Sequence, residues 1–171
     1  MNSKINYENR KALDISDFEF LSLFKKENEK VYFRLIQEEN HIAKNFDCLL
    51  SLDNDLEYPL MQKIFQKYQN QGFGIYFVVN SGGQKKKSIK RINAHFIDMD
   101  FGKVPKIEGE ELIKNSEGKI VYEYRNKEEI EEYKTAFLKK LENFKLIPNV
   151  IVETKNGFHV YWLLDPDKPQ S

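Results

Sequence analysis

The stretch 149–164, NVIVETKNGFHVYWLL, decides the fold class of this 171-residue chain. Two runs rich in β-branched and aromatic residues, 149–154 and 158–164, flank the turn residues Lys155-Asn156-Gly157, a pattern typical of a β-hairpin. Immediately upstream, residues 128–144 carry apolar side chains at helical spacing. A helix followed by an antiparallel strand pair predicts an α+β unit with the helix packed on one face of the sheet.

The rest of the chain adds predicted elements of both kinds. The predicted elements are helices over 15–24 and 55–68, strands over 31–36, 75–79 and 94–101, and a hairpin over 110–124 that turns at Asn115-Ser116-Glu117-Gly118. In the second helix the expected buried side is Leu56, Leu60, Ile64 and Tyr68, spaced four residues apart. The predicted fold is therefore α+β, a mostly antiparallel sheet with helices packed on one face, plus an N-terminal helical embellishment. The length indicates one domain over 14–171 after a flexible arm over 1–13.

Composition narrows the class of protein. The 27 Lys+Arg balance the 27 Asp+Glu, which argues against a histone-like protein but allows a local basic patch to bind nucleic acid. The only cysteine, Cys48, excludes an internal disulfide and a CxxC zinc site. The sequence has no 18-residue apolar run and no signal-peptide core, so we expect a cytoplasmic protein without a membrane partner.

Residues 94–101, AHFIDMDF, place two acids in a predicted strand. Because side chains alternate along a strand, Asp98 and Asp100 share one face about 6–7 Å apart, while Ile97, Met99 and Phe101 point toward a core. A bound Mg²⁺ or Mn²⁺ would relieve the repulsion between the two carboxylates. The alternative is a strand end where two acids emerge into solvent. A hydrolase of the haloacid-dehalogenase type also begins with DxD but continues with Gly and then Thr or Val, unlike this chain.

The hairpin over 149–164 carries a second group of polar residues. Gly157 allows backbone N–H groups to approach a phosphate, with Thr154 and Lys155 beside it. His159 follows the turn and can donate a hydrogen bond to the same anion. A histidine in a strand often has only a structural role, which is the alternative. A sheet with one apolar and one polar face would bring His159 to the side of the two acids.

A basic segment precedes the DxD strand. Five positive charges fall within seven residues with no acid among them: Lys85, Lys86, Lys87, Lys90 and Arg91. Such a cluster can follow a nucleic-acid backbone or contact triphosphate oxygens, and its binding would depend on salt. A solvated loop is the alternative for the lysines. Arg91 lies next to the strand and is the better candidate for a contact with nucleotide phosphates.

Taken in order, these segments resemble a known family. Residues 72–80 (GFGIYFVVN), the basic loop, Ile97–Asp100 and the pattern Thr154-x-x-Gly157-x-His159-x-Tyr161-Trp162 resemble the archaeo-eukaryotic primase superfamily, in the form of the primase-polymerase domains of plasmids, phages and other mobile elements. The resemblance implies an RRM-like sheet with the site on its open face. It also implies a nucleotidyltransferase that makes primers by two-metal phosphoryl transfer, with the metal ions ~3.5–4 Å apart.

The resemblance assigns roles to individual residues. Asp98 and Asp100 would bind Mg²⁺ or Mn²⁺, and Thr154 and His159 would contact the phosphates of the incoming nucleotide, with Lys155 as a further candidate. The implied partners are a dNTP or NTP, a single-stranded DNA template, and a helicase domain or protein. The family also has a third metal-binding carboxylate on a later strand, so we expect the chain to be the front part of a longer protein. The alternative is a natural remnant with an incomplete site.

Two further functions remain open at this point. A non-catalytic RRM-like module could bind single-stranded nucleic acid on aromatic side chains. A replication initiator of the nicking type has a similar fold, but its chemistry needs a His-x-His metal pair and a tyrosine nucleophile. Residues 158–161, FHVY, contain a single histidine.

Overall fold

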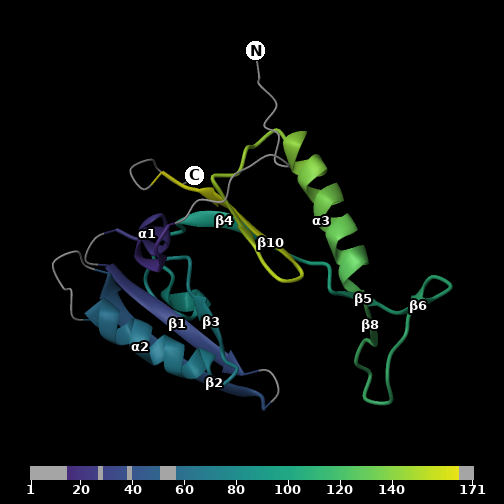
Figure 1. Cartoon of the computed structure of the whole chain (residues 1–171), viewed down its shortest axis with the longest axis horizontal. Helices are drawn as coiled ribbons and strands as arrows, with labels where there is room; N and C mark the ends of the chain where they lie inside the picture. The colour runs from purple at the N-terminus through teal and green to yellow at the C-terminus, as the bar shows by residue number, and fades with distance from the viewer. Residues whose placement is uncertain (1–14, 27–28, 38–39, 51–56, 166–171) are drawn as a thin grey trace. The chain divides into compact units, whose positions relative to one another are not determined.

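A computed structural model gives the fold of the chain (Figure 1). It describes residues 15–26, 29–37, 40–50 and 57–165, so the predicted arm over 1–13 lies outside the described residues. The chain divides into two compact units. The N-terminal unit contains the described residues up to His95 together with 163–165, and the C-terminal unit is Phe96–Trp162.

The N-terminal unit contains a three-stranded sheet in the order β2-β1-β3. The central strand β1 (Glu29–Gln37) pairs antiparallel with β2 (Ile42–Leu50) on one side and with β3 (Gly74–Phe77) on the other. The sequence patterns did not predict β2, whose first four residues are all exposed. Polar residues on an edge strand hide the alternation that marks a buried strand. This part of the chain therefore has a sheet of its own and is more than the expected helical embellishment.

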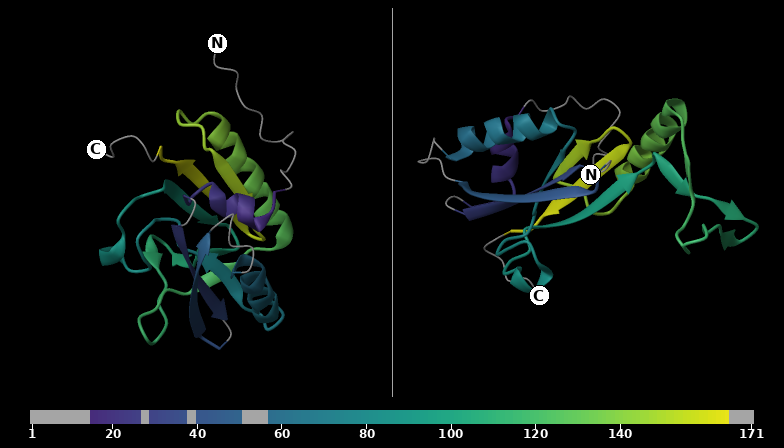
Figure 2. Two further views of the ribbon diagram at one scale, coloured as in Figure 1. Left: turned by 90° about the vertical axis from the view of Figure 1, so that its left-hand side faces the viewer. Right: turned by 90° about the horizontal axis from the view of Figure 1, so that it is seen from below.

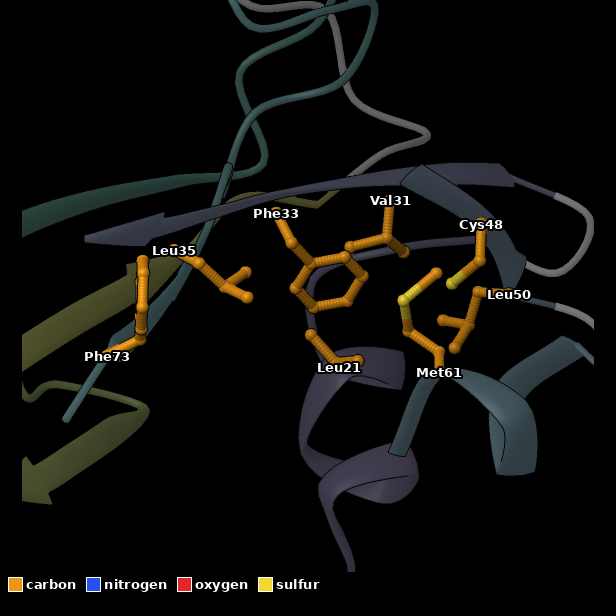
Figure 3. Packing of buried hydrophobic residues seen from close by; sticks show 8 residues of the cluster. All are labelled: Leu21, Val31, Phe33, Leu35, Cys48, Leu50, Met61 and Phe73. Carbon is orange, nitrogen blue, oxygen red and sulfur yellow. The ribbon is translucent and has the colours of Figure 1, made fainter. Parts of the chain in front are cut away.

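Two helices cover one face of this sheet, α1 (Asp17–Ser22) and α2 (Glu57–Gln69). Figure 3 shows Val31, Phe33 and Leu35 pointing from β1 toward Leu21 of α1 and Met61 of α2. The right-hand view of Figure 2 shows α2 running along the sheet. The other buried members of this core are Cys48, Leu50 and Phe73. Side chains from both helices and from all three strands of this sheet thus contribute to one apolar cluster.

The buried side of α2 differs from the predicted one by one position. Leu60 is 60% exposed, whereas Met61 is 8% exposed and belongs to the core. Ile64 and Tyr68 pack against that core as predicted, and Leu56 lies outside the described residues. With 3.6 residues per turn, steps of four drift around the helix, and the true stripe follows mixed steps of three and four.

The C-terminal unit contains the predicted hairpin in a sheet of order β4-β10-β9. The strands are β4 (Ala94–Asp100), β9 (Val150–Glu153) and β10 (Gly157–Leu163), and β9 pairs antiparallel with β10. The predicted helix is α3 (Lys127–Glu142), which lies beside β10 in Figure 1. It packs on one face of the sheet through a core of Phe101, Ile130, Leu138, Leu141, Phe158 and Val160.

Strand β4 lies at the edge of this sheet, and only part of its apolar side reaches the core. Phe101 is buried in the cluster and Met99 packs against it, as expected. Ile97 is 38% exposed, so the prediction that it points into a core is wrong. An edge strand has a neighbour on one side only and is therefore covered less evenly than a central strand.

Between β4 and α3 the chain forms two short ribbons. One pairs β5 (Lys103–Pro105) with β8 (Tyr122–Tyr124), and the other pairs β6 (Ile107–Glu108) with β7 (Glu111–Leu112). The predicted turn is present, because the Asn115 carbonyl accepts a hydrogen bond from Gly118, whose φ is +77°. The Lys114–Ile120 bridge closes it.

Within the described ranges the chain has three α-helices and mostly antiparallel sheets, which confirms the α+β class. None of these helices combines the length and the apolar character that crossing a bilayer requires.

Candidate functional site

The pairing of β4 with β10 sets the geometry of the candidate site. The Phe101 amide donates to the Asn156 carbonyl at 2.9 Å, and the Leu164 amide donates to the Asn93 carbonyl at 2.9 Å. The residue numbers of both pairs add to the same value, so the strands run antiparallel without a bulge between these bonds. By this register, Asp98 lies directly opposite His159.

The side chains of this cross-strand pair meet on one face of the sheet. The His159 Nε2 atom lies 3.4 Å from the Asp98 Oδ1 atom. The Asp98 side chain is 66% exposed and that of His159 is 33% exposed, so both are accessible to a ligand. The core residues Phe158 and Val160, the neighbours of His159 on β10, point to the opposite face and into the core under α3.

Asp100 shares the face of Asp98, because two residues separate them along β4. Its Oδ1 atom accepts a 2.8 Å hydrogen bond from the backbone N–H of Gly102. A side chain at Gly102 would collide with the amide of Asn156, which lies in the β9–β10 turn. The backbone after β4 therefore orients the Asp100 carboxylate, and the sequence patterns did not mark Gly102 or Asn156 as part of the site.

Gly157 allows the two strands to approach each other. A Cβ atom at this position would overlap the backbone carbonyl oxygen of Met99. The sequence predicts that this glycine allows contact with a phosphate, and the structure shows that it permits the close packing of β10 on β4.

Aromatic side chains continue the same face of the sheet beyond the acids. The Phe96 ring lies 5.8 Å from the Tyr161 ring, and the His159 ring lies 6.5 Å from Tyr161. Burial raises the pKa of the Tyr161 hydroxyl, and the nearby charge of Asp98 raises it further. Tyr161 therefore stays protonated over a wider pH range than an exposed tyrosine.

Thr154 and Lys155 lie where the sequence predicted them, at the turn between β9 and β10. The Thr154 amide donates to the Gly157 carbonyl at 2.9 Å, which closes the turn. Thr154 is half-buried and Lys155 is exposed. By strand alternation Thr154 falls on the face of His159, two residues beyond Val152, the β9 partner of His159.

The carboxylates of Asp98 and Asp100 are suitable ligands for a hard divalent cation, but they form an incomplete site. Mg²⁺ commonly uses one or two carboxylates and takes its other ligands from water and substrate phosphates. Asp98 and Asp100 provide such oxygens on one exposed face. Among the residues with described positions, no group of three or more His, Cys, Asp or Glu side chains forms a complete ligand cluster. The pair therefore supplies only part of the ligand set that such an ion requires.

Arg91 belongs to the N-terminal unit, where a polar network engages its guanidinium group. It donates to Glu29 at 2.7 Å, to the Asn93 side chain at 2.7 Å and to the Ser81 hydroxyl at 3.1 Å. Asn93 is buried and also donates to the Val79 carbonyl and to Ser81. These contacts give Arg91 a structural role in closing the loop that follows β3, and its contact with nucleotide phosphates stays a prediction.

The four predicted nucleic-acid-binding lysines lie on this closed loop, and all four are exposed: Lys85, Lys86, Lys87 and Lys90. A backbone bridge between Ser81 and Arg91 joins the two ends of the loop. Ser88 orders its tip, because its hydroxyl donates to the Lys85 carbonyl at 2.7 Å. The lysines therefore project from an ordered loop.

The structure thus brings together one part of the predicted site. Asp98, Asp100, Thr154 and His159 share a face of the C-terminal sheet, and Lys155 lies at its turn. Arg91 and the lysines belong to the other unit. Comparisons of the chain with protein-family models, with curated proteins and with solved structures find no match.

We expect Gly157→Ala to destabilise the protein by about 2 kcal/mol or more, because β4 must move away from the added methyl group. Urea unfolding measures the loss. Gly109→Ala is the control, because nothing lies within 4 Å of the added atom, and only its positive φ opposes the change, at about 1 kcal/mol. Equal losses in the two variants would show that the strands are not packed as closely as described.

The free energy of unfolding is expected to depend on pH through the side chain of Lys25. Burial lowers the pKa of this lysine from 10.5 to about 8, although Glu29 opposes the change, and its Nζ donates to the Asn80 carbonyl. Because the unfolded chain holds the proton more tightly than the folded protein, the free energy of unfolding should rise as pH increases above about 8.

The measurement compares urea midpoints of the wild type and Lys25→Met between about pH 8 and pH 9. Above that range the Cys48 thiol, whose pKa burial raises from 9.0 to about 11, acts in the opposite direction. We expect the wild-type midpoint to rise relative to that of the variant. If the midpoints of the two proteins changed in parallel with pH, the lowered pKa of Lys25 would be contradicted.

Proposed function

We propose that the open face of the β4-β10-β9 sheet is the metal-nucleotide site of a primase-polymerase-type nucleotidyltransferase. The observation that carries this proposal is the register of β4 and β10, which places Asp98 opposite His159 with Asp100 on the same face. The two motifs that resemble the primase superfamily are far apart in sequence, and a shared site requires them to face each other.

Asp98 and Asp100 would hold Mg²⁺ or Mn²⁺ through their carboxylate oxygens. When bound, such ions lower the pKa of an attacking hydroxyl and stabilise the charge of a leaving pyrophosphate. The chain itself supplies the orientation of the Asp100 carboxylate, because the backbone N–H of Gly102 holds one of its oxygens.

His159, Thr154 and Lys155 would bind the phosphates of a dNTP or NTP. The imidazole of His159, whose Nε2 atom lies on the face of Asp98, donates to a phosphate oxygen in this arrangement. Lys155 is exposed at the turn and adds a positive charge next to the same face.

The basic loop would bind the template strand. Its four lysines are exposed on a segment, 80–93, that contains no acidic residue. Phosphate contacts of this kind carry no sequence information and suit a protein that copies any template.

A second candidate is a non-catalytic module that binds single-stranded nucleic acid. Phe96 is 52% exposed beside Tyr161 on the open face, where a base could stack. Asp98 and Asp100 on the same face would repel a strand unless metal ions intervene, which favours the first proposal.

The decisive experiment is calorimetric titration of dATP and ATP into the chain with Mn²⁺. We expect metal-dependent binding that weakens about tenfold or more in Asp98→Asn and His159→Ala, because each removes one contact to the metal or the phosphates. His95→Ala is the matched control, since His95 is an exposed residue of the same strand outside the Asp98 face.

The absence of a metal-dependent increase in affinity, or equal affinity for the metal-nucleotide in all three variants, would contradict the proposal. Binding of a single-stranded oligonucleotide in the absence of any nucleotide affinity would favour the second candidate instead.

Replacing Lys85, Lys86 and Lys87 with alanine should weaken binding to single-stranded DNA and reduce its salt dependence. The slope of log K against log salt is negative, and the loss of three phosphate contacts should reduce its magnitude by about 2. Fluorescence anisotropy across a salt series measures the slope. The matched triple arginine variant keeps the charges and should keep the slope. An unchanged slope in the alanine variant would place the DNA elsewhere.

A further inference from the structure

A cavity of about 680 Å³ lies inside the N-terminal unit, between α1, α2 and the sheet. Its volume falls within the range of about 300–1,000 Å³ that is common for sites of small organic ligands. Its apolar walls are Phe20, Leu21, Phe33, Phe65, Ile75 and Phe77. None of these residues belongs to the sheet that carries Asp98 and His159, so the cavity is separate from the candidate site.

Phenylalanine rings form most of the apolar wall and fix one another in place. The Phe33 ring meets the Phe65 ring edge to face with 4.6 Å between centroids. Phe20 meets Phe77 in the same way at 5.8 Å. Rings in such arrangements present faces and edges that suit a flat aromatic ligand better than a flexible chain.

The rim of the cavity is polar and comes mainly from one helix. Gln62, Gln66 and Gln69 follow each other on one side of α2, and all three are exposed. Within the described part of the chain, their side-chain amides make no hydrogen bond. Each amide offers both a donor and an acceptor, so the rim provides unused groups of both kinds next to an aromatic wall.

The charges at the rim balance. Lys63 and Asp17 contribute one positive and one negative group, so the rim does not select a charged ligand. An aliphatic chain would leave the glutamine amides without partners as they lose water. A planar ring with several donors and acceptors on its edge satisfies both the wall and the rim.

We propose that this cavity binds an uncharged heteroaromatic ring of the nucleobase class, either as a free nucleoside or as a base of a nucleic-acid strand. The bound ring stacks against the phenylalanines, and its edge bonds to the amides of α2. The proposal does not depend on the metal-nucleotide site, because all of its residues lie in the other unit.

The test is nuclear magnetic resonance of the whole isotope-labelled chain during titration with adenosine, guanosine, cytidine and thymidine, without metal. We expect the side-chain amide signals of Gln62, Gln66 and Gln69 to shift with at least one nucleoside, while the signals of Asp98 and His159 stay in place. A parallel titration with a short single-stranded oligonucleotide shows whether a base within a strand binds more tightly than the free nucleoside.

Variants of exposed residues keep the test independent of folding. Gln62→Ala combined with Gln66→Ala should weaken binding about tenfold or more, since two amide contacts are lost. Gln84→Ala removes an exposed amide outside the cavity and should leave the affinity unchanged. Absence of shifts with every nucleoside and with the oligonucleotide would overturn the proposal. It would also be overturned if toluene bound as tightly as the nucleosides and the double variant kept full affinity.

Discussion

The close approach of Gly157 to the Met99 carbonyl determines the geometry of the C-terminal unit. Without a side chain at this point, β10 can lie against the end of β4, and the Phe101–Asn156 hydrogen bond forms beside it. A shift of one residue in this register would carry His159 from the open face to the face under α3. The hydrophobic core opposes such a shift, because Phe158 and Val160 would then lose their places in it.

The same strands therefore serve two purposes with alternate residues. On one face, apolar side chains of β10 hold α3 and provide the stability of the unit. On the other face, the sheet can carry carboxylates and an imidazole at exposed positions, because no core packing depends on them. Asp98 also lies on an edge strand, where a charged residue discourages pairing with another chain. Residues on the open face of this small sheet can thus change without altering the core on its other face.

The sequence patterns were reliable where a local period determines the structure. The hairpin at Lys155–Gly157 and the helix before it follow from spacing alone, and strand alternation predicted that His159 and Asp98 share a face. The partner of Arg91 could not be predicted in this way. Glu29 lies 62 residues earlier in the chain, so the pattern around Arg91 holds no trace of the ion pair that engages it.

The position of residues on edge strands explains other differences between the predicted and the observed structure. Ile97 and the first half of β2 lie on edge strands, where solvent accepts apolar and polar side chains alike, so their sequences carry a weak signal. Gly102 and Asn156 contribute to the site through backbone and packing contacts. Such contacts depend on a specific approach of two segments, which residue type and spacing do not encode.

The bridge between Ser81 and Arg91 makes the basic loop a closed module whose ends are fixed independently of its tip. Closure entropy grows slowly with the length of a loop, so residues added or removed at Gln84–Lys87 would change reach and charge at little cost to the sheet below. This loop is therefore a natural insertion point for evolution, and for an engineer who wishes to attach a label or a peptide.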